Sequence, residues 1–448
     1  MRTKRLLAAL LVGALAVGIT GCSSGSSSSS NSSTGSASVS GSSQKLSGSL
    51  SIWAWAGSDG ESKARKDMIE LFIKNHPELK VTYTILPTAN QAWDQKAAAA
   101  LAAGNAGDVM QMSPDYYGMN TKYYVDLNSY VKKDSTDLKS VLTPGMIDGY
   151  YDADGKLEGF PLMTNCFVMA YNKDMFDKAG VAYPKDGWTM DDLSNWGKKF
   201  ASGSGATQTY AIAKHWVMDK LMLYVEGGTP YTKDFKTSNM GSNEIVKSLA
   251  LYQKLIKSGI MPSDTASKSI PSETLFTSGK AAMYPMGGFE SAQIISDAEQ
   301  NGIKLGFASM PSDPSGNEVN VQYATGWAIT TTCKNNDAAW QFLKESAYAN
   351  DNMAKITATV GIPADYKIAK ADYAKITTGG VKFTNDYYVN HISKSHLNPF
   401  GGALASSGDI WTSMAQEATL NGKDPSTVVK TYAPKIATEI EGYSSKKK

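Results

Sequence analysis

A few residues in this chain have the types and spacing that catalysis could use, but their surroundings do not support it. Asp191 and Asp192 are adjacent carboxylates, yet they fall in the first turn of an expected helix, where acidic side chains cap the helix and offset its dipole. The four histidines show no metal-ligand spacing, and the closest two, His391 and His396, have no acidic or thiol partner near them. No Walker loop, HExxH motif or dinucleotide fingerprint occurs in a suitable context. The sequence therefore offers no positive case for an enzyme, a metal site or a cofactor.

The elements that would position a site alternate between strands and helices. The first five are expected to be the strand 50–56, a helix that starts after Ser58, the strand 81–86, the helix 93–103 and the strand 109–112. Ser58 and Glu61 form a capping-box pattern, and Ala64, Met68 and Phe72 fall on one helical face together with Leu71. This β-α-β-α-β order is typical of a mostly parallel sheet, whose ligands bind beyond the carboxyl ends of the strands. Trp55 and Asp59 follow the first strand, and Asp115 and Tyr116 follow the third, so all four are candidates for a site.

The first 49 residues indicate export and anchoring. Arg2, Lys4 and Arg5 precede an apolar run of about fourteen residues, fewer than the ~20 that a spanning helix needs, which is typical of a secretory signal. The four residues that end at Cys22 resemble the bacterial lipobox, whose cysteine thiol accepts a diacylglycerol. Residues 23–49 are rich in serine and glycine and too polar to bury a core. We therefore expect cleavage after residue 21, lipidation of Cys22, and a tether that holds the chain on the outer face of a Gram-positive-type cell membrane.

The composition of the remaining chain supports neither a nucleic-acid partner nor a fold held by disulfides. Without the three cations of the signal the chain carries 41 basic and 42 acidic residues, and this balance gives no electrostatic case for nucleic acid. The terminal tail 444–448 is basic, and we expect it to be exposed to solvent. Cys166 and Cys333 are the only other cysteines, so no disulfide framework is expected, and two free buried thiols are favoured over one bridge.

A series of ordered blocks carries a resemblance to a known family. The blocks are Gly155–Pro161, Tyr171–Phe176, Gly187–Leu193, Leu275–Met283, Leu305–Pro311, Gly326–Ile329 and Ala338–Leu343. Together they resemble the family 1 extracellular solute-binding proteins, which are the sugar-capturing subunits of bacterial ABC importers related to maltose-binding protein. At Gly187-Trp188-Thr189 the family usually has Thr-Trp and an acidic residue, but Thr189 and Asp192 still form a capping box. Tyr171, Phe176 and Trp188 are expected in the core.

The resemblance implies a carbohydrate site, and the residue types agree with one. A pyranose has an apolar face that stacks on aromatic rings and a rim of hydroxyls that bind carboxylates, amides and hydroxyls; this chain has nine tryptophans and 23 tyrosines. Carried over residue by residue, the family's sugar-contacting places fall on Asp115 with Tyr116, Asn165 in place of a carboxylate, His215 with Trp216, Phe289 with Glu290, and Trp411.

The fold that the resemblance implies is an α/β, two-lobed, type II periplasmic-binding-protein-like fold with the ligand in a cleft between the lobes. The expected segments are 50–164 and 285–330 for lobe 1 and 165–284 and 331–443 for lobe 2, with crossings near Thr164, Tyr284 and Thr331. On closure, Asp115 and Phe289 are expected to contact the ligand from lobe 1, and His215, Trp216 and Trp411 from lobe 2.

The function that follows is capture of an extracellular carbohydrate, an oligosaccharide in the first instance, and its delivery to the permease subunits of an ABC transporter by a monomer that needs no cofactor. Two alternatives remain open. One is a binding protein for another polar solute, such as a polyamine or a peptide. The other is a lipid-anchored glycoside hydrolase, which would require two carboxylates about 5–10 Å apart across the scissile bond.

Overall fold

The computed structural model describes residues 46–88, 92–114, 121–152, 155–232, 237–400 and 405–445, all of which belong to one compact unit, Leu46–Lys448. Cys22, Asp115 and Tyr116 therefore lie outside the described residues, as does nearly all of the expected signal and tether. Across the described ranges no helix combines the length and the hydropathy that crossing a membrane requires.

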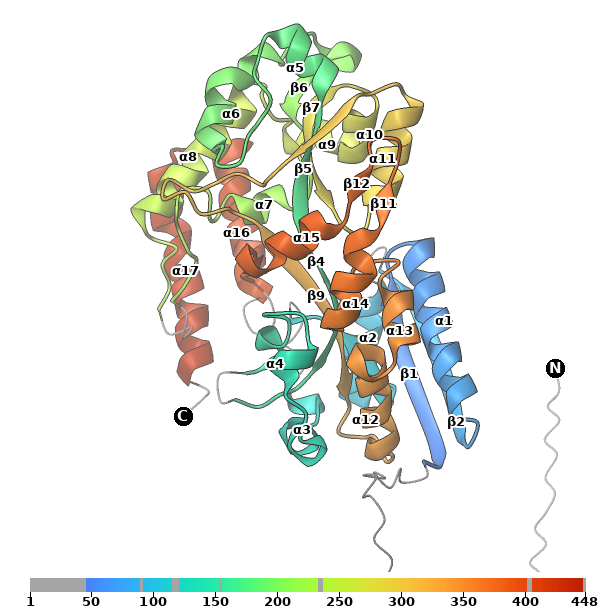
Figure 1. Cartoon of the computed structure of the whole chain (residues 1–448). Coiled ribbons are helices and arrows are strands. Elements are labelled where there is room, and N and C mark those ends of the chain that lie inside the picture. Colours follow the sequence, from blue (N-terminus) through green and yellow to red (C-terminus); the bar gives the residue numbers. More distant parts are fainter. Residues whose placement is uncertain are drawn as a thin grey trace, which may run out of the picture. The chain divides into compact units, whose positions relative to one another are not determined.

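The first sheet has seven strands and is mixed (Figure 1). Its strands, in the order of pairing, are β10 (Ile362–Pro363), β4 (Phe160–Asn165), β9 (Val321–Ile329), β3 (Val109–Met112), β1 (Gly48–Ala56) and β2 (Leu79–Pro87), with β13 (His396–Leu397) paired to β9. β1 is parallel to β2 and β3, as the alternating pattern predicts. β9 is antiparallel to both β3 and β4. The expectation of a mostly parallel sheet is therefore wrong beyond the first three strands, because β4 and β9 are not joined by the helical crossovers that parallel neighbours need.

The helices that cover this sheet bury the faces that their sequences predict. In α1 (Asp59–Asn75) the Ser58 side chain accepts a hydrogen bond from the Glu61 N–H, and Ala64, Met68 and Phe72 are buried. Leu71, expected on the same face, is only partly buried. The other helices with side chains in or against this core are α2 (Ala92–Ala103), α3 (Asn128–Asp134), α4 (Leu138–Val141), α12 (Asn336–Lys344) and α13 (Asp351–Thr357). We call this sheet with its helices the first lobe.

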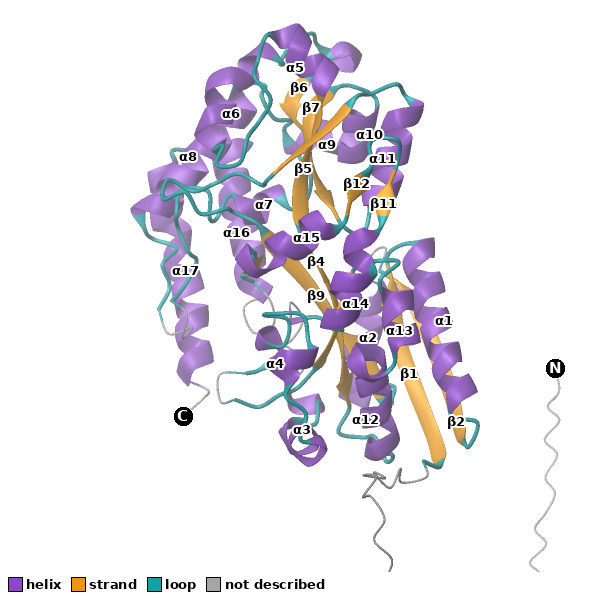
Figure 2. Ribbon diagram, viewed as in Figure 1, coloured by secondary structure: helices purple, strands orange, loops and turns teal. Residues whose placement is uncertain are grey.

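The second sheet has four strands, in the order β6 (Tyr210–Ile212), β7 (Ala281–Gly287), β5 (Phe167–Asn172) and β8 (Leu305–Ala308). Helices cover both of its faces (Figure 2). One core contains side chains from α5 (Lys173–Ala179), α6 (Met190–Trp196), α7 (Met218–Leu221), α8 (Asn243–Lys257), α16 (Ala405–Thr419) and α17 (Pro425–Ser445). The other contains side chains from α10 (Ser272–Thr277), α11 (Ser291–Gln300), α14 (Tyr366–Ala371) and α15 (Asp386–His391). The short elements α9 (Asp264–Ser269), β11 (Thr377–Thr378) and β12 (Phe383–Thr384) complete this second lobe.

Local predictions for the second lobe hold. Thr189 and Asp192 form the expected capping box at the start of α6. Tyr171, Phe176 and Trp188 are buried in the core, as predicted. Acidic residues at the start of α6 therefore cap a helix rather than form a catalytic pair.

The chain passes between the two sheets at places that differ in part from the expected boundaries. The first passage is at Cys166, between β4 and β5, which agrees with the crossing expected near Thr164. The expected segment 285–330 of lobe 1 is divided, because β7 and β8 both pair with β5 and only β9 pairs with the first sheet. The segment from 331 likewise starts in the first lobe, since α12 packs there. Tyr284 lies within β7 in the second sheet, and Thr331 lies between β9 and α12 in the first lobe. Neither residue therefore marks a passage between the lobes.

The passage from β8 to β9 is fixed to the start of β5 by one buried amide. Asn320 Oδ1 accepts from the Phe167 N–H at 3.1 Å, and Asn320 Nδ2 donates to the Phe167 carbonyl at 2.8 Å. Cys166, next to Phe167, and Cys333 are both buried and free, as predicted. Two of the connections between the lobes are thus held together by backbone-directed hydrogen bonds.

Candidate functional site

Two exposed aromatic rings lie next to each other at the edge of the second sheet. Trp216, in the turn before α7, is 50% exposed, and Phe289, directly after β7, is 38% exposed. Their ring centroids are 6.4 Å apart and their planes differ by 31°. Single exposed apolar side chains are common, but two adjacent exposed aromatic rings form a contiguous apolar patch, which is a feature of binding sites. We call Trp216 and Phe289 the aromatic platform.

Buried and half-buried rings support the aromatic platform from below. Phe167, which is fully buried at the start of β5, makes edge contacts with Trp216 at 5.7 Å and with Phe289 at 6.2 Å. Tyr323 on β9 makes a further edge contact with Trp216 at 4.8 Å. Each such pair contributes about 0.5–1.5 kcal/mol beyond the area that it buries. The platform is therefore held by strands of both sheets, because β9 belongs to the first and β5 to the second.

Two glycines allow the close approach on which this arrangement depends. A Cβ on Gly287 would lie 2.3 Å from the Phe289 ring, so only glycine lets that ring fold back over the strand. A Cβ on Gly288 would lie 2.9 Å from both Asn165 Oδ1 and Tyr373 Oη. Both of these atoms are buried without a hydrogen-bond partner among the described residues. Buried polar atoms are normally paired, so Asn165 and Tyr373 offer hydrogen-bonding capacity beside the platform.

A polar network connects the two loops that carry the aromatic platform. Glu290 follows Phe289, and its Oε1 accepts from the Gly287 N–H at 3.0 Å while its Oε2 accepts from the Tyr284 hydroxyl at 3.0 Å. Glu290 Oε1 also faces His215 Nε2 at 3.5 Å. His215 precedes Trp216, and its Nδ1 accepts from the Val217 N–H at 3.2 Å. Because Nδ1 is an acceptor, the proton of a neutral His215 ring lies on Nε2, directed toward Glu290.

Burial shifts the pKa values of this network toward its uncharged forms. Burial lowers the pKa of His215 to about 3, so its ring is neutral at physiological pH. Burial also raises the pKa of Glu290 to about 7, and the hydrogen bonds from Gly287 and Tyr284 oppose that shift without cancelling it. The pKa of the Tyr284 hydroxyl is raised by burial and by the neighbouring Glu290. Below about pH 7 the groups beneath the platform therefore carry no charge.

The candidate residues of the first lobe form a separate group at the carboxyl end of β1. Trp55 is half-buried with its ring 5.2 Å from Trp93, and its N–H donates to Gln111 Oε1 at 3.1 Å. Arg65, only 1% exposed, donates to the same Gln111 oxygen at 3.3 Å. Asp59 is exposed in the first turn of α1. Trp55 and Asp59 thus lie near a strand end, and their contact with a ligand stays a prediction.

The structure brings together five of the candidate residues and separates others. His215, Trp216, Phe289 and Glu290 form one cluster, and Asn165 joins it through Gly288. His215 is 2% exposed, so it supports the platform instead of contacting a ligand. Phe289 belongs to the second lobe and not to the first, because β7 pairs with β5.

Trp411 does not form the aromatic plate that was expected of it. It is fully buried within α16, in the core of the second lobe, and its Nε1–H donates to the Asp219 carbonyl at 2.7 Å. Tyr323 and Phe167, which sequence reasoning missed, contact the aromatic platform instead. Met414, Ala415 and Ala418 follow Trp411 at helical spacing and are buried with it, which is the sequence pattern of a core face.

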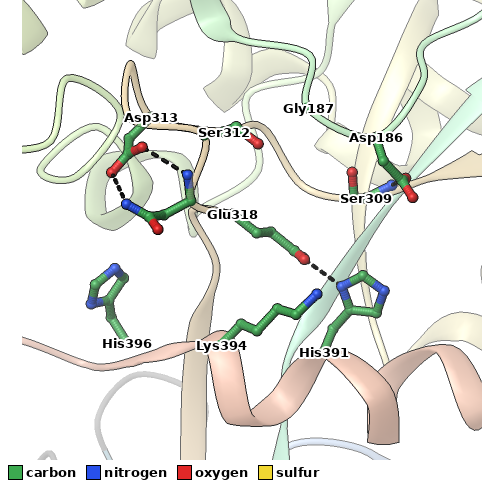
Figure 3. A pocket seen from close by; sticks show the side chains of 11 residues that line it. Asp186, Gly187, Ser309, Ser312, Asp313, Glu318, His391, Lys394 and His396 are labelled. Atoms are coloured by element: carbon green, nitrogen blue, oxygen red, sulfur yellow. Dashed lines mark hydrogen bonds and ion pairs between the residues drawn. The ribbon is translucent and has the colours of Figure 1, made fainter.

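A second cavity, of about 540 Å³, lies elsewhere in the second lobe and is lined by segments 186–187, 309–318 and 391–396. Figure 3 shows Glu318 and His391 directed toward each other, with Lys394 alongside. The wall is polar, and its two rings, His391 and His396, are stacked on tyrosines. None of the described residues that line it is a tryptophan, tyrosine or phenylalanine. In the ranges that the structure covers, no group of three His, Cys, Asp or Glu side chains could hold a metal ion.

Comparison with known proteins decides the family. Residues 56–354 match the model of the bacterial extracellular solute-binding protein family. The chain belongs to this family. Its members bind solutes and do not catalyse reactions, so the glycoside hydrolase alternative falls away, and the resemblance seen in the ordered sequence blocks is confirmed.

Named relatives extend the comparison. The chain is 26% identical over 338 residues to the galactooligosaccharide-binding protein of Bacillus subtilis, covering 72% of this chain and 76% of that protein. It is 27% identical over 314 residues to a maltooligosaccharide ABC transporter solute-binding lipoprotein of Streptococcus pneumoniae, covering 65% and 69%. Among solved structures, an ABC substrate-binding protein of Listeria monocytogenes in complex with cycloalternan has a TM-score of 0.73 at 21% identity, covering 87% of this chain and 98% of that one. The structural likeness confirms the type II binding-protein fold.

Proposed function

We propose that this protein captures a neutral carbohydrate on the aromatic platform and delivers it to the permease subunits of an ABC transporter. The observation that carries the proposal is the pair of adjacent exposed rings, Trp216 and Phe289, in a chain of the solute-binding family. The two named relatives are described as binding oligosaccharides, which supports an oligosaccharide as the ligand.

The chemistry beside the rings suits a sugar. The flat rings can stack on the apolar face of a pyranose, and the Glu290 carboxyl, whose side chain is 20% exposed, can bind a hydroxyl at its edge. A polyamine would instead require fixed negative charge, and Glu290 is largely uncharged below about pH 7. These features favour a neutral polyhydroxy ligand over a cationic one.

The first lobe is proposed to close over the ligand. Trp55 and Asp59 lie at a strand end of that lobe, and Asp115 and Tyr116 follow another strand of it in the sequence. A ligand that touches both lobes favours the closed form by its difference in affinity for the two states. Loaded and empty binding proteins would then differ in shape, which a permease can distinguish.

We also propose that a lipid anchor holds the protein at the cell membrane. The family is extracellular, and the pneumococcal relative is described as a lipoprotein. We infer from the lipobox-like residues that Cys22 carries a diacylglycerol and that the serine-rich segment after it is a tether. Several acyl chains on one cysteine would hold the protein firmly at the membrane, since stable anchoring takes more than one chain.

A thermal-shift screen over mono- and oligosaccharides tests the proposal. A ligand at about 100 times its dissociation constant adds ~2.7 kcal/mol of stability, which is readily seen as a rise in the unfolding temperature. Maltooligosaccharides and galactooligosaccharides are the first ligands to include, with spermidine as the cationic comparison. Trp216→Ala should reduce the sugar response, because weaker binding gives a smaller gain in stability at the same sugar concentration. A response to spermidine alone, with none to any sugar, would contradict the proposal.

A further inference from the structure

The Glu290 carboxyl group contacts both loops that carry the aromatic platform. It follows Phe289 in the chain, accepts from the Gly287 N–H and the Tyr284 hydroxyl, and faces His215, the neighbour of Trp216. The Glu290 side chain is 20% exposed, whereas His215 is 2% exposed. Glu290 is therefore the member of the network that a ligand on the platform would cover.

We infer that Glu290 is the positioning and specificity-determining residue of the platform, and that it takes up a proton when a neutral ligand covers Trp216 and Phe289. The inference rests on the proposed function, because it requires an uncharged sugar as the ligand. A neutral ligand removes the water that remains around the carboxyl without supplying a countercharge. Loss of water disfavours the charged form of a carboxylate, so the complex binds a proton more tightly than the free protein does.

The surroundings provide a place for that proton. In the free protein Glu290 Oε2 accepts from Tyr284 Oη at 3.0 Å. When the carboxyl is protonated, its O–H donates to Tyr284 Oη, and the tyrosine proton can turn toward Ser272, a second hydrogen-bonding neighbour of that hydroxyl. Glu290 Oε1 keeps the bond from the Gly287 N–H in either state. The contact between the two loops of the platform therefore survives protonation.

The groups that face Glu290 set the direction of the pH dependence. His215 faces it from the turn before α7, Tyr284 from β7 and Glu273 from α10. His215 stays neutral because burial lowers its pKa to about 3, and Tyr284 stays protonated because its pKa is raised. Glu273 is exposed, and its negative charge raises the pKa of Glu290. Glu290, with a pKa of about 7, changes charge near neutral pH.

Linkage then gives the sign and the size of the effect. A group that binds its proton more tightly in the complex makes ligand affinity fall as pH rises above the pKa of the free protein. If the ligand raises that pKa by about one unit, affinity at about pH 8 is roughly fivefold weaker than at about pH 6. A cationic ligand would show the opposite trend, because it would favour the ionised carboxylate.

The experiment measures the dissociation constants of maltotriose and of a galactooligosaccharide by calorimetry from about pH 6 to about pH 8 in the wild type, in Glu290→Gln and in Asp297→Asn. Asp297 is a carboxylate on the same helix, α11, outside the Glu290 network, so its variant should behave as the wild type does. Glu290→Gln keeps an oxygen for the Gly287 N–H but cannot titrate. Its affinity should therefore be independent of pH, while wild-type affinity falls about fivefold.

Two measurements keep the test decisive if Glu290→Gln does not fold. Wild-type titrations near pH 7 in buffers of different ionisation enthalpy should show proton uptake on binding. Tyr284→Phe removes one donor to the carboxylate and should move the pH midpoint upward. Sugar binding without proton uptake, or a pH slope that persists in Glu290→Gln, would overturn the inference and leave the proposed function intact. If no sugar binds at any pH and spermidine binds more tightly as pH rises, both this inference and the proposed function are wrong.

Discussion

Replacing Trp411 and Trp216 by alanine should separate a core ring from a binding ring. A tryptophan side chain buries about 150–250 Å², and at about 25 cal/mol per Å² complete burial contributes at most ~4–6 kcal/mol. Trp411 is fully buried, and its loss also leaves the Asp219 carbonyl without its 2.7 Å donor. Trp411→Ala should therefore destabilise the protein by about 4 kcal/mol, within the usual range of ~3–5 kcal/mol for such truncations.

Trp216 should respond in the opposite way. It is 50% exposed, so its buried half contributes at most about 3 kcal/mol to stability. Loss of its ring should weaken sugar binding at least tenfold, a change of about 1.4 kcal/mol in binding free energy. Trp216→Phe keeps a stacking surface and should recover part of that affinity, which makes it the matched control.

The assay combines urea denaturation with calorimetric sugar titration on the same three variants. The expected pattern is a large loss of stability with retained affinity for Trp411→Ala, and a small loss of stability with weak binding for Trp216→Ala. The reasoning is refuted if Trp411→Ala unfolds at the wild-type urea concentration while losing affinity. It is equally refuted if Trp216→Ala retains full affinity in its folded fraction.

Three further outcomes are expected. Gly288→Ala should destabilise the protein by about 1–3 kcal/mol and weaken sugar binding, because its Cβ would lie 2.9 Å from Asn165 Oδ1 and Tyr373 Oη. Urea denaturation and calorimetry measure the two effects. Gly60→Ala, whose Cβ would have no contact under 3.9 Å, is the control. Cys22→Ala should move the protein from the membrane to the soluble fraction on cell fractionation without changing its sugar affinity, and a variant that stays with the membrane would contradict the lipid anchor. A tight sugar should reduce the radius of gyration measured by X-ray scattering, and an unchanged radius would rule out closure of the lobes.

Local order in the chain was predictable where hydrophobic period and capping agree. The strand-helix alternation from Leu50 to Met112 was expected and is observed, because each element there has a distinct period and a clear start or stop. The division between lobes was not, since the pairing partners of β7, β8 and β9 leave no mark in one sequence. The antiparallel strands of the first sheet were not predicted for the same reason.

The candidate site was predictable in part for a related reason. Trp216, Phe289 and Glu290 were expected and do lie together, although their contact with a ligand remains a prediction. Trp411 was misplaced although the sequence held the signal, because Met414, Ala415 and Ala418 follow it at helical spacing and share its buried face. Phe167, which supports the aromatic platform, was missed because only the paired strands reveal that it lies beneath Trp216.

The interleaving of the two lobes has a consequence for how the protein is made. The first sheet contains β9, β10 and β13, which are synthesised only after all four strands of the second sheet, and the core of the second lobe contains α16 and α17 near the end of the chain. Neither lobe can therefore complete its fold until these late segments have been made, and pairings between such distant segments form slowly. A secretory machinery that threads unfolded polypeptides thus receives a chain whose own topology delays folding until nearly all of it has crossed the membrane.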